Sequence, residues 1–243
     1  SDPNVMNWTY YNSVYSTPDF QRLWGLMAYL NQRGIINGLV PKFGGPAALW
    51  LGGLSLTPGY ENEYAEQTAS ALIYARNTLH LQFSAVVPVN EPDWHDSGVQ
   101  MTGPAQYVTV MRDLGQQLDA RGMSDVRFCG PELAWTSTDW LAAMMGDAYL
   151  MSKVAWFGLH SYQDLSYDST GVYDFIRQSA YPNSRFWMTE FGVWCWSCQG
   201  TAGDGSWAYA RGTASALLEH LANGASPGIV WDGYDSPPLR NNA

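Results

Sequence analysis

Short apolar runs alternate with segments of helical period along most of this chain. The runs are rich in β-branched and aromatic residues, which favour strands, and the stretches between them are long enough for helices. The expected strands lie at 5–10, 35–41, 82–89, 126–131, 154–160, 185–190 and 228–232. This alternation predicts parallel strands that are joined by helical crossovers.

The expected helices carry recognisable start and stop signals. In the segment 104–121, apolar residues such as Tyr107 and Leu114 recur with helical period, Pro104 suits the first turn, and Gly122 suits the end. Similar apolar faces predict further helices at 20–33, 61–79 and 206–222.

A closed parallel (β/α)8 TIM-type barrel fits this pattern best, because runs such as FSAVV and GIVW are apolar on both faces. A doubly wound sheet is the main alternative, but KFGGPA at 42–47 lacks the glycine spacing of a nucleotide-binding turn. We expect one catalytic barrel domain over residues 1–243. Its first strand and helix and its last helix are not evident, so another chain or a longer parent protein would supply them.

Composition excludes several classes of partner. The formal net charge is −10, and only 14% of the residues are charged, against roughly 25% in an average domain. We therefore expect no binding to nucleic acid or to a membrane surface. The 12 Trp and 15 Tyr residues predict that some rings face a ligand. The start, SDPNVMNWTYY, lacks the pattern of an export signal, so we expect a secreted protein whose signal has been removed.

The three cysteines fall into two groups. Cys129 lies in an apolar run, which predicts a buried thiol. Cys195 and Cys198 form CWSC in a Trp-rich loop without the context of a zinc site or a thioredoxin-type motif. We predict a short disulfide there, which would fit an oxidising compartment.

Two glutamates follow apolar strands. The segment VVPVNEPDW places Glu91 at one predicted strand end, and FWMTEFGVW places Glu190 at another. The carboxyl ends of the strands form the reactive face of a parallel barrel, so both side chains are expected to reach one substrate. Hydrolysis of a glycosidic bond needs such a pair, one protonated and one ionised. The residues alone do not say which glutamate plays which role.

Four pieces, in this order, resemble glycoside hydrolase clan A, especially families 5, 30 and 39: Asn90-Glu91-Pro92, His160-Ser161-Tyr162, Thr189-Glu190-Phe191-Gly192, and Trp231 in IVWDGYDS. The resemblance implies that Glu91 is the acid/base and Glu190 the nucleophile of a retaining mechanism. It further implies that Asn90 binds the 2-hydroxyl of the attacked sugar. Tyr162 and His160 would orient Glu190, and Trp231 would form the floor of the sugar subsite.

Other side chains are weaker candidates for substrate binding. Glu132, in GPELAW, is a rival carboxylate that could bind sugar or support the structure. Aromatic rings pack on pyranose faces, and the expected loops after the strands hold Trp50, Trp94, Trp135, Trp194 and Trp231. The four histidines lack metal-ligand spacing, so we expect no metal and no cofactor.

These observations predict a retaining glycoside hydrolase that cleaves a β-linked oligo- or polysaccharide, with endo action on a polymer favoured by the aromatic content. Two alternatives stay open. One is a carbohydrate-binding protein without turnover, and the other is a transglycosylase on the same scaffold.

Overall fold

The computed structural model describes residues 5–94, 98–135, 137–162, 170–195, 200–201 and 207–230. The chain forms two compact units. Unit 1 comprises Ser1–Pro131 and Asp139–Ala155, and unit 2 comprises Glu132–Thr138 and Trp156–Ala243. The expectation of one domain over residues 1–243 therefore remains a prediction. Among the described residues, no helix combines the length and apolar character needed to cross a membrane.

Unit 1 is mainly helical. Its elements are α1 (Trp8–Tyr15), α2 (Pro18–Gln32), the 3₁₀ turn η1 (Leu49–Leu51), α3 (Glu61–Ile73), the π-helical turn η2 (Tyr74–Thr78), β1 (Ala85–Val86), α4 (Pro104–Asp119), most of β2 (Arg127–Leu133), α5 (Thr138–Met145) and α6 (Ala148–Lys153). The predicted helices at 20–33, 61–79 and 104–121 are thus confirmed.

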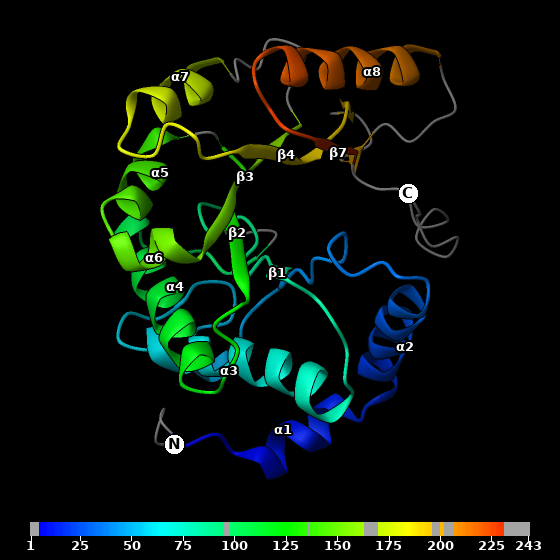
Figure 1. Cartoon of the computed structure of the whole chain (residues 1–243), viewed down its shortest axis with the longest axis vertical. Coiled ribbons are helices and arrows are strands. Elements are labelled where there is room, and N and C mark those ends of the chain that lie inside the picture. The colour runs from blue at the N-terminus through cyan, green and yellow to red at the C-terminus, as the bar shows by residue number, and fades with distance from the viewer. Residues whose placement is uncertain are drawn as a thin grey trace. The chain divides into compact units, whose positions relative to one another are not determined.

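Helix α4 shows how local sequence sets its bounds. Pro104 occupies the first turn, where its missing N–H costs no helical hydrogen bond. Gly122 follows the end with a φ of 75°, which glycine adopts readily. Tyr107 and Leu114 on its inner face are fully buried. The helix packs along α3, where Ala65 and Ala69 are also completely buried (Figure 1).

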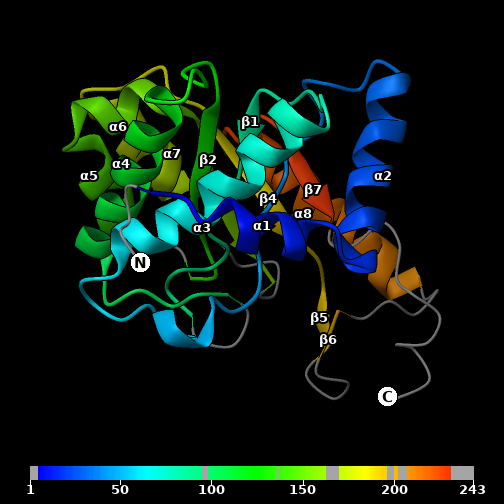
Figure 2. The ribbon, with the colours of Figure 1, turned by 90° about the horizontal axis from the view of Figure 1, so that it is seen from below.

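The predicted strand at 5–10 is wrong, because this segment begins helix α1 (Figure 2). The side chain of Asn7 caps the helix by accepting a hydrogen bond from the main-chain N–H of Tyr10. Helical spacing then places Tyr11 and Tyr15 on one buried face, where their hydroxyls contact Glu66 and Ser70 of α3. Packing against α3 therefore overrides the strand preference of these aromatic residues.

The predicted strand at 35–41 is wrong as well. Residues 35–41 form a turn and irregular backbone, and the nearest pairing is a bridge of Lys42, just after the segment, parallel to Val87. The main-chain N–H of Val87 donates to Pro41 O, and that of Phe43 donates to Val87 O, both at 2.9 Å. Pro41 has no N–H for a strand ladder, so pairing is limited to this short stretch.

Unit 2 holds the last two residues of β2 and the strands that follow it in the chain. It contains β3 (Val154–Ser161, from Trp156 on), α7 (Thr170–Gln178), β4 (Phe186–Phe191), β5 (Trp194–Cys195), β6 (Gly200–Thr201), α8 (Trp207–Ala222) and β7 (Gly228–Val230). These elements confirm the predicted strands at 154–160 and 185–190 and the helix at 206–222 where they are described. Of the expected strand 228–232, residues 231 and 232 lie outside the described residues.

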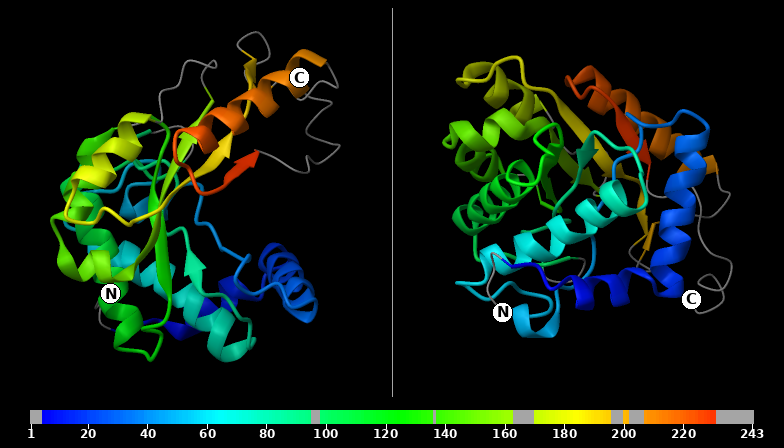
Figure 3. Two further views of the ribbon diagram at one scale, coloured as in Figure 1. Left: turned by 45° about the horizontal axis from the view of Figure 1, so that its top comes forward. Right: turned by 60° about the horizontal axis from the view of Figure 1, so that its bottom comes forward.

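The main sheet has the strand order β1-β2-β3-β4-β7, and its described pairings, β1–β2, β3–β4 and β4–β7, are parallel. In unit 2, Phe157 pairs with Phe186 and Leu159 with Met188, and these four side chains are completely buried. Helix α8 packs against β4 and β7 (Figure 3). The predicted alternation of strand and helix is therefore present.

One buried carboxyl in unit 1 predicts a pH effect on stability. Burial raises the pKa of Glu66, although the hydrogen bond from Tyr11 opposes this rise. The folded state thus favours protonated Glu66. This contribution to stability is full below the ordinary value of 4.5 and is lost as the pH rises through the raised pKa.

The variant Glu66→Gln is neutral at every pH, so it should not show this loss. Its melting temperature, compared with that of the unsubstituted chain, is expected to rise progressively as the pH increases above the ordinary value of 4.5. Thermal denaturation followed by circular dichroism at several pH values measures the difference. A difference that does not change with pH would contradict the role of Glu66.

Candidate active site

Glu190 lies near the end of β4 and is buried. The hydroxyl of Tyr162, which follows β3, donates a hydrogen bond of 2.6 Å to Glu190 Oε2. A hydrogen bond donated to a carboxylate fixes its orientation. The end of β4 thus presents a carboxylate that is already held in place.

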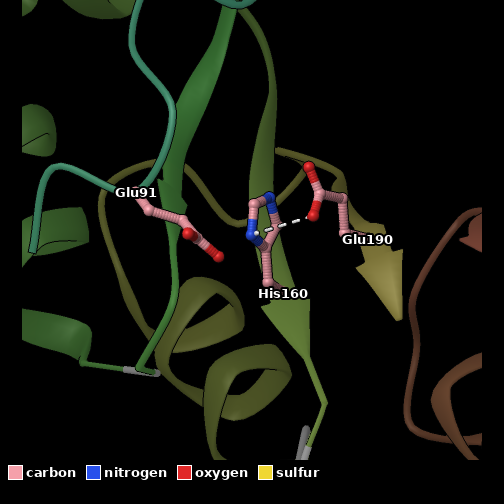
Figure 4. A group of neighbouring side chains, drawn as sticks. All are labelled: Glu91, His160 and Glu190. Atoms are coloured by element: carbon pink, nitrogen blue, oxygen red, sulfur yellow. Dashed lines mark ion pairs between the residues drawn. The ribbon is translucent and has the colours of Figure 1, made fainter. Parts of the chain in front are cut away.

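His160 lies beside Glu190 in the strand pairing of β3 and β4. The ring is completely buried, and its Nδ1 atom is 3.7 Å from Glu190 Oε2 (Figure 4). Its other nitrogen, Nε2, lies 3.1 Å from Glu132 Oε2. One imidazole therefore stands between two carboxyl groups.

Glu132 reaches this cluster from the end of β2. It is completely buried, and its φ of 58° is unusual for a residue with a side chain. Glu132 Oε1 accepts a hydrogen bond of 2.8 Å from the hydroxyl of Thr189. The buried position and the two polar partners make Glu132 part of a connected network rather than an isolated charge.

Thr189 is the member of this cluster that the sequence did not single out. Residues 189 and 190 are consecutive in a strand, and a regular strand points neighbours to opposite faces. The pairing of β3 with β4 shifts register between Leu159 and His160. Thr189 reaches the network through Glu132, and its position directly before Glu190 in TEFG was the available signal.

In unit 1, Asn90 and Glu91 follow β1 and are both buried. Glu91 has a φ of 43°, which is sparsely populated by residues other than glycine. The N–H of Asn90 donates to Phe43 O at 3.1 Å, and that of Trp94 donates to Glu91 O at 3.0 Å. A Cβ on Gly98 would meet the main-chain O of Asn90 at 2.0 Å, so only glycine fits against this turn. These contacts fix the backbone that carries Glu91.

The aromatic and cysteine candidates are more dispersed. Trp94 is partly buried, whereas Trp50 and Trp135 are exposed. The Trp50 ring meets Tyr60 edge to face with centroids 6.0 Å apart. Cys129 is completely buried. The structure describes only the backbone of Trp194 and Cys195, in β5, while Trp231 and Cys198 lie outside the described residues.

Within unit 2, the structure brings together four of the candidate residues: Glu132, His160, Tyr162 and Glu190. Asn90, Glu91 and Trp94 form a second group after β1 in unit 1. The catalytic and sugar-binding roles assigned to these residues stay predictions. The expected disulfide and the expected absence of a metal and a cofactor also stay predictions.

Comparison with protein families gives one assignment. The family model described as "Glycosyl hydrolase catalytic core" matches residues 60–221. This range contains Glu91, Glu132, His160, Tyr162 and Glu190. A comparison with curated protein sequences found no match.

Several solved structures resemble the chain. SrfJ from Salmonella typhimurium has a TM-score of 0.55 at 15% identity, over 78% of this chain and 39% of that one. A GH30 endoxylanase from Clostridium papyrosolvens gives 0.51 at 17%, over 74% and 42%. A GH39 enzyme from Xanthomonas axonopodis pv. citri gives 0.52 at 16%, over 73% and 38%.

The chain thus spans about two fifths of the length of these structures. At such low identity the likeness concerns the fold alone. It confirms the predicted class, the parallel (β/α)8 barrel of glycosidases, of which the described residues of this chain hold five strands of the main sheet.

Proposed function

The chain belongs to the glycosyl hydrolase catalytic core family, and from this premise we propose that it carries the active site of a retaining β-glycosidase. Glu190 is the proposed nucleophile and Glu91 the proposed acid/base. The observation that supports this most directly is the buried Glu190 carboxylate, which accepts a 2.6 Å hydrogen bond from Tyr162.

Glu190 has the surroundings that a nucleophile requires. Its carboxylate must be ionised and must point in a fixed direction before the sugar arrives, because reorientation during the reaction would raise the barrier. The Tyr162 hydroxyl donates a hydrogen bond to Oε2, and the His160 ring lies 3.7 Å from the same oxygen.

Glu91 is proposed to act from the end of β1 in the same parallel sheet. The carboxyl ends of parallel strands share one edge of a sheet, so Glu91, which follows β1, and Glu190, near the end of β4, are proposed to serve one substrate. A retaining mechanism predicts carboxyl groups about 5–5.5 Å apart. Asn90 would bind the 2-hydroxyl of the attacked sugar, and Trp231 would support its ring.

The proposed reaction has two steps. In the first step, Glu190 attacks the anomeric carbon while Glu91 donates its proton to the departing glycosidic oxygen, which leaves a glycosyl ester on Glu190. In the second step, Glu91 takes a proton from water, the water oxygen bonds to the anomeric carbon, and the Glu190 carboxylate departs. Both glutamates return to their starting states, and the product keeps its anomeric configuration.

The proposed substrate is a β-linked polysaccharide that is cleaved internally outside the cell. Exposed rings such as Trp50 and Trp135 offer flat surfaces for further sugar units, and a CWSC disulfide would fit an extracellular setting. One similar structure is that of an endoxylanase, which makes xylan a reasonable first polymer to test.

A panel of aryl β-glycosides and soluble polysaccharides, including xylan, tests this proposal with the whole chain. We expect hydrolysis of at least one substrate, and NMR of the first product should show the retained β configuration. An α product would contradict the retaining mechanism. Glycan binding without turnover would favour a carbohydrate-binding protein, and transfer to added acceptor sugars as the main product would favour a transglycosylase.

A further inference from the structure

Glu132 is a buried carboxyl group that the proposed reaction does not use. It is 0% exposed, and its left-handed backbone conformation carries strain that the surrounding structure must offset. A buried carboxylate is costly unless polar or charged partners compensate for the loss of water. Its partners therefore indicate what it does.

One oxygen of Glu132 is held by Thr189. The Thr189 hydroxyl lies 2.8 Å from Glu132 Oε1 and 3.1 Å from the main-chain O of Leu159. A hydroxyl has a single proton to donate, and the shorter contact is the one to Glu132. A donated bond to a charged oxygen is stronger than one to a neutral carbonyl, so this contact favours ionised Glu132.

The other oxygen of Glu132 faces His160, whose second nitrogen faces Glu190. The distances are 3.1 Å from Nε2 to Glu132 Oε2 and 3.7 Å from Nδ1 to Glu190 Oε2. A neutral imidazole has a proton on only one nitrogen, so the lone pair of the unprotonated nitrogen would face a carboxylate. A doubly protonated ring presents N–H groups to both carboxylates.

We propose that Glu132 is a positioning residue that keeps His160 doubly protonated, so that the Nδ1–H group faces and stabilises the ionised carboxylate of Glu190. The titratable groups that face this ring in unit 2 are Glu132 from β2, Tyr162 after β3 and Glu190 from β4. The proposed function adds Glu91 to them. One imidazolium between two carboxylates lowers the electrostatic cost of burying both.

The catalytic consequence rests on the proposed function. If Glu190 is the nucleophile, the imidazolium stabilises the negative charge with which it attacks the sugar. Glu132 touches neither the sugar nor the reacting atoms in this scheme and acts only through His160. Loss of its charge should therefore change turnover and pH dependence more than substrate binding.

The charge on His160 can be measured without turnover. In protein labelled with ¹⁵N-histidine, protonated and unprotonated ring nitrogens resonate at different positions, and His160→Gln identifies the signals of this ring among the four histidines. At about pH 7 we expect two protonated nitrogens in the unsubstituted chain, although an ordinary histidine is mostly neutral there. In Glu132→Gln we expect one of them to lose its proton.

Kinetics separate the charge of Glu132 from its shape. Glu132→Gln keeps the shape and removes the charge, and we expect kcat to fall about 10- to 100-fold with little change in KM. The acid limb of the kcat/KM profile should move to higher pH. Glu132→Asp keeps the charge in a shorter side chain, so kcat should fall while the acid limb stays in place.

Several results would overturn the proposal: an unprotonated His160 nitrogen in the unsubstituted chain, or a Glu132→Gln variant with unchanged NMR signals or an unchanged acid limb. An equal shift of the limb in Glu132→Asp and Glu132→Gln would assign the effect to packing. If Glu132→Gln does not fold, the NMR result on the unsubstituted chain still decides. Failure of the proposed function would instead appear as absence of turnover in the unsubstituted chain, with the state of His160 unaffected.

Discussion

Replacing Glu190 with Gln is expected to lower kcat on the best aryl β-glycoside by about 10⁴-fold or more, which is the scale seen when a catalytic nucleophile is removed. The amide has nearly the shape of the carboxylate, so it can still accept the hydrogen bond from Tyr162. It has no negative charge with which to attack the anomeric carbon. Initial rates measured with the folded variant, checked by circular dichroism, give the size of the loss.

A matched control comes from α8. Glu219→Gln makes the same chemical change in the same unit, outside the Glu190 cluster, and should leave kcat unchanged. Glu190→Ala should regain turnover with added azide, and the glycosyl azide formed should have the opposite anomeric configuration to the normal product. Rates near that of the unsubstituted chain in both Glu190 variants would exclude Glu190 as the nucleophile.

Replacing Glu91 with Ala is expected to have an effect that depends on the leaving group. General acid catalysis contributes about 10²- to 10⁴-fold, and a loss of this size should be seen with a polysaccharide, whose leaving alcohol needs a proton. An aryl glycoside with an acidic phenol leaves without that proton, so its first step should be nearly as fast as in the unsubstituted chain. Comparison of kcat/KM across aryl glycosides of decreasing phenol acidity measures this dependence.

The second step offers an independent check on Glu91. Without a base, water attacks the glycosyl ester slowly, so the variant should release phenol in a burst and accumulate labelled protein that mass spectrometry detects. Azide needs no base and should speed up this step with retained configuration. Glu63→Ala in α3 is the matched control in unit 1. A Glu91→Ala variant with equal losses on all leaving groups would not fit an acid/base role.

The elements that the sequence predicted well are those whose signals are local. Helix α4 follows from Pro104, Gly122 and an apolar face, and these features act within a few turns of the chain. Strands β3 and β4 follow from apolar runs that are long enough to be buried. Their ends place Tyr162 and Glu190 where the sequence predicted strand ends.

The predicted strand at 5–10 is wrong because its conformation depends on a distant partner. The aromatic residues around Tyr11 are typical of a strand, yet they form a helix. In this helix the hydroxyls of Tyr11 and Tyr15 form hydrogen bonds with Glu66 and Ser70 of α3. The sequence of residues 8–15 alone does not show that α3 will pack against them.

By itself, the sequence determined the class of chemistry, since two glutamates after apolar strands and a low content of basic residues restrict the choice of substrate and mechanism. The tertiary structure decided the surroundings of Glu190. Thr189, Glu132 and His160 lie on three different strands, and only the folded chain brings them into contact. A hydrogen bond forms only when its donor and acceptor are placed to within a few tenths of an ångström. The folded chain fixes such distances, and the spacing of residues in the sequence does not.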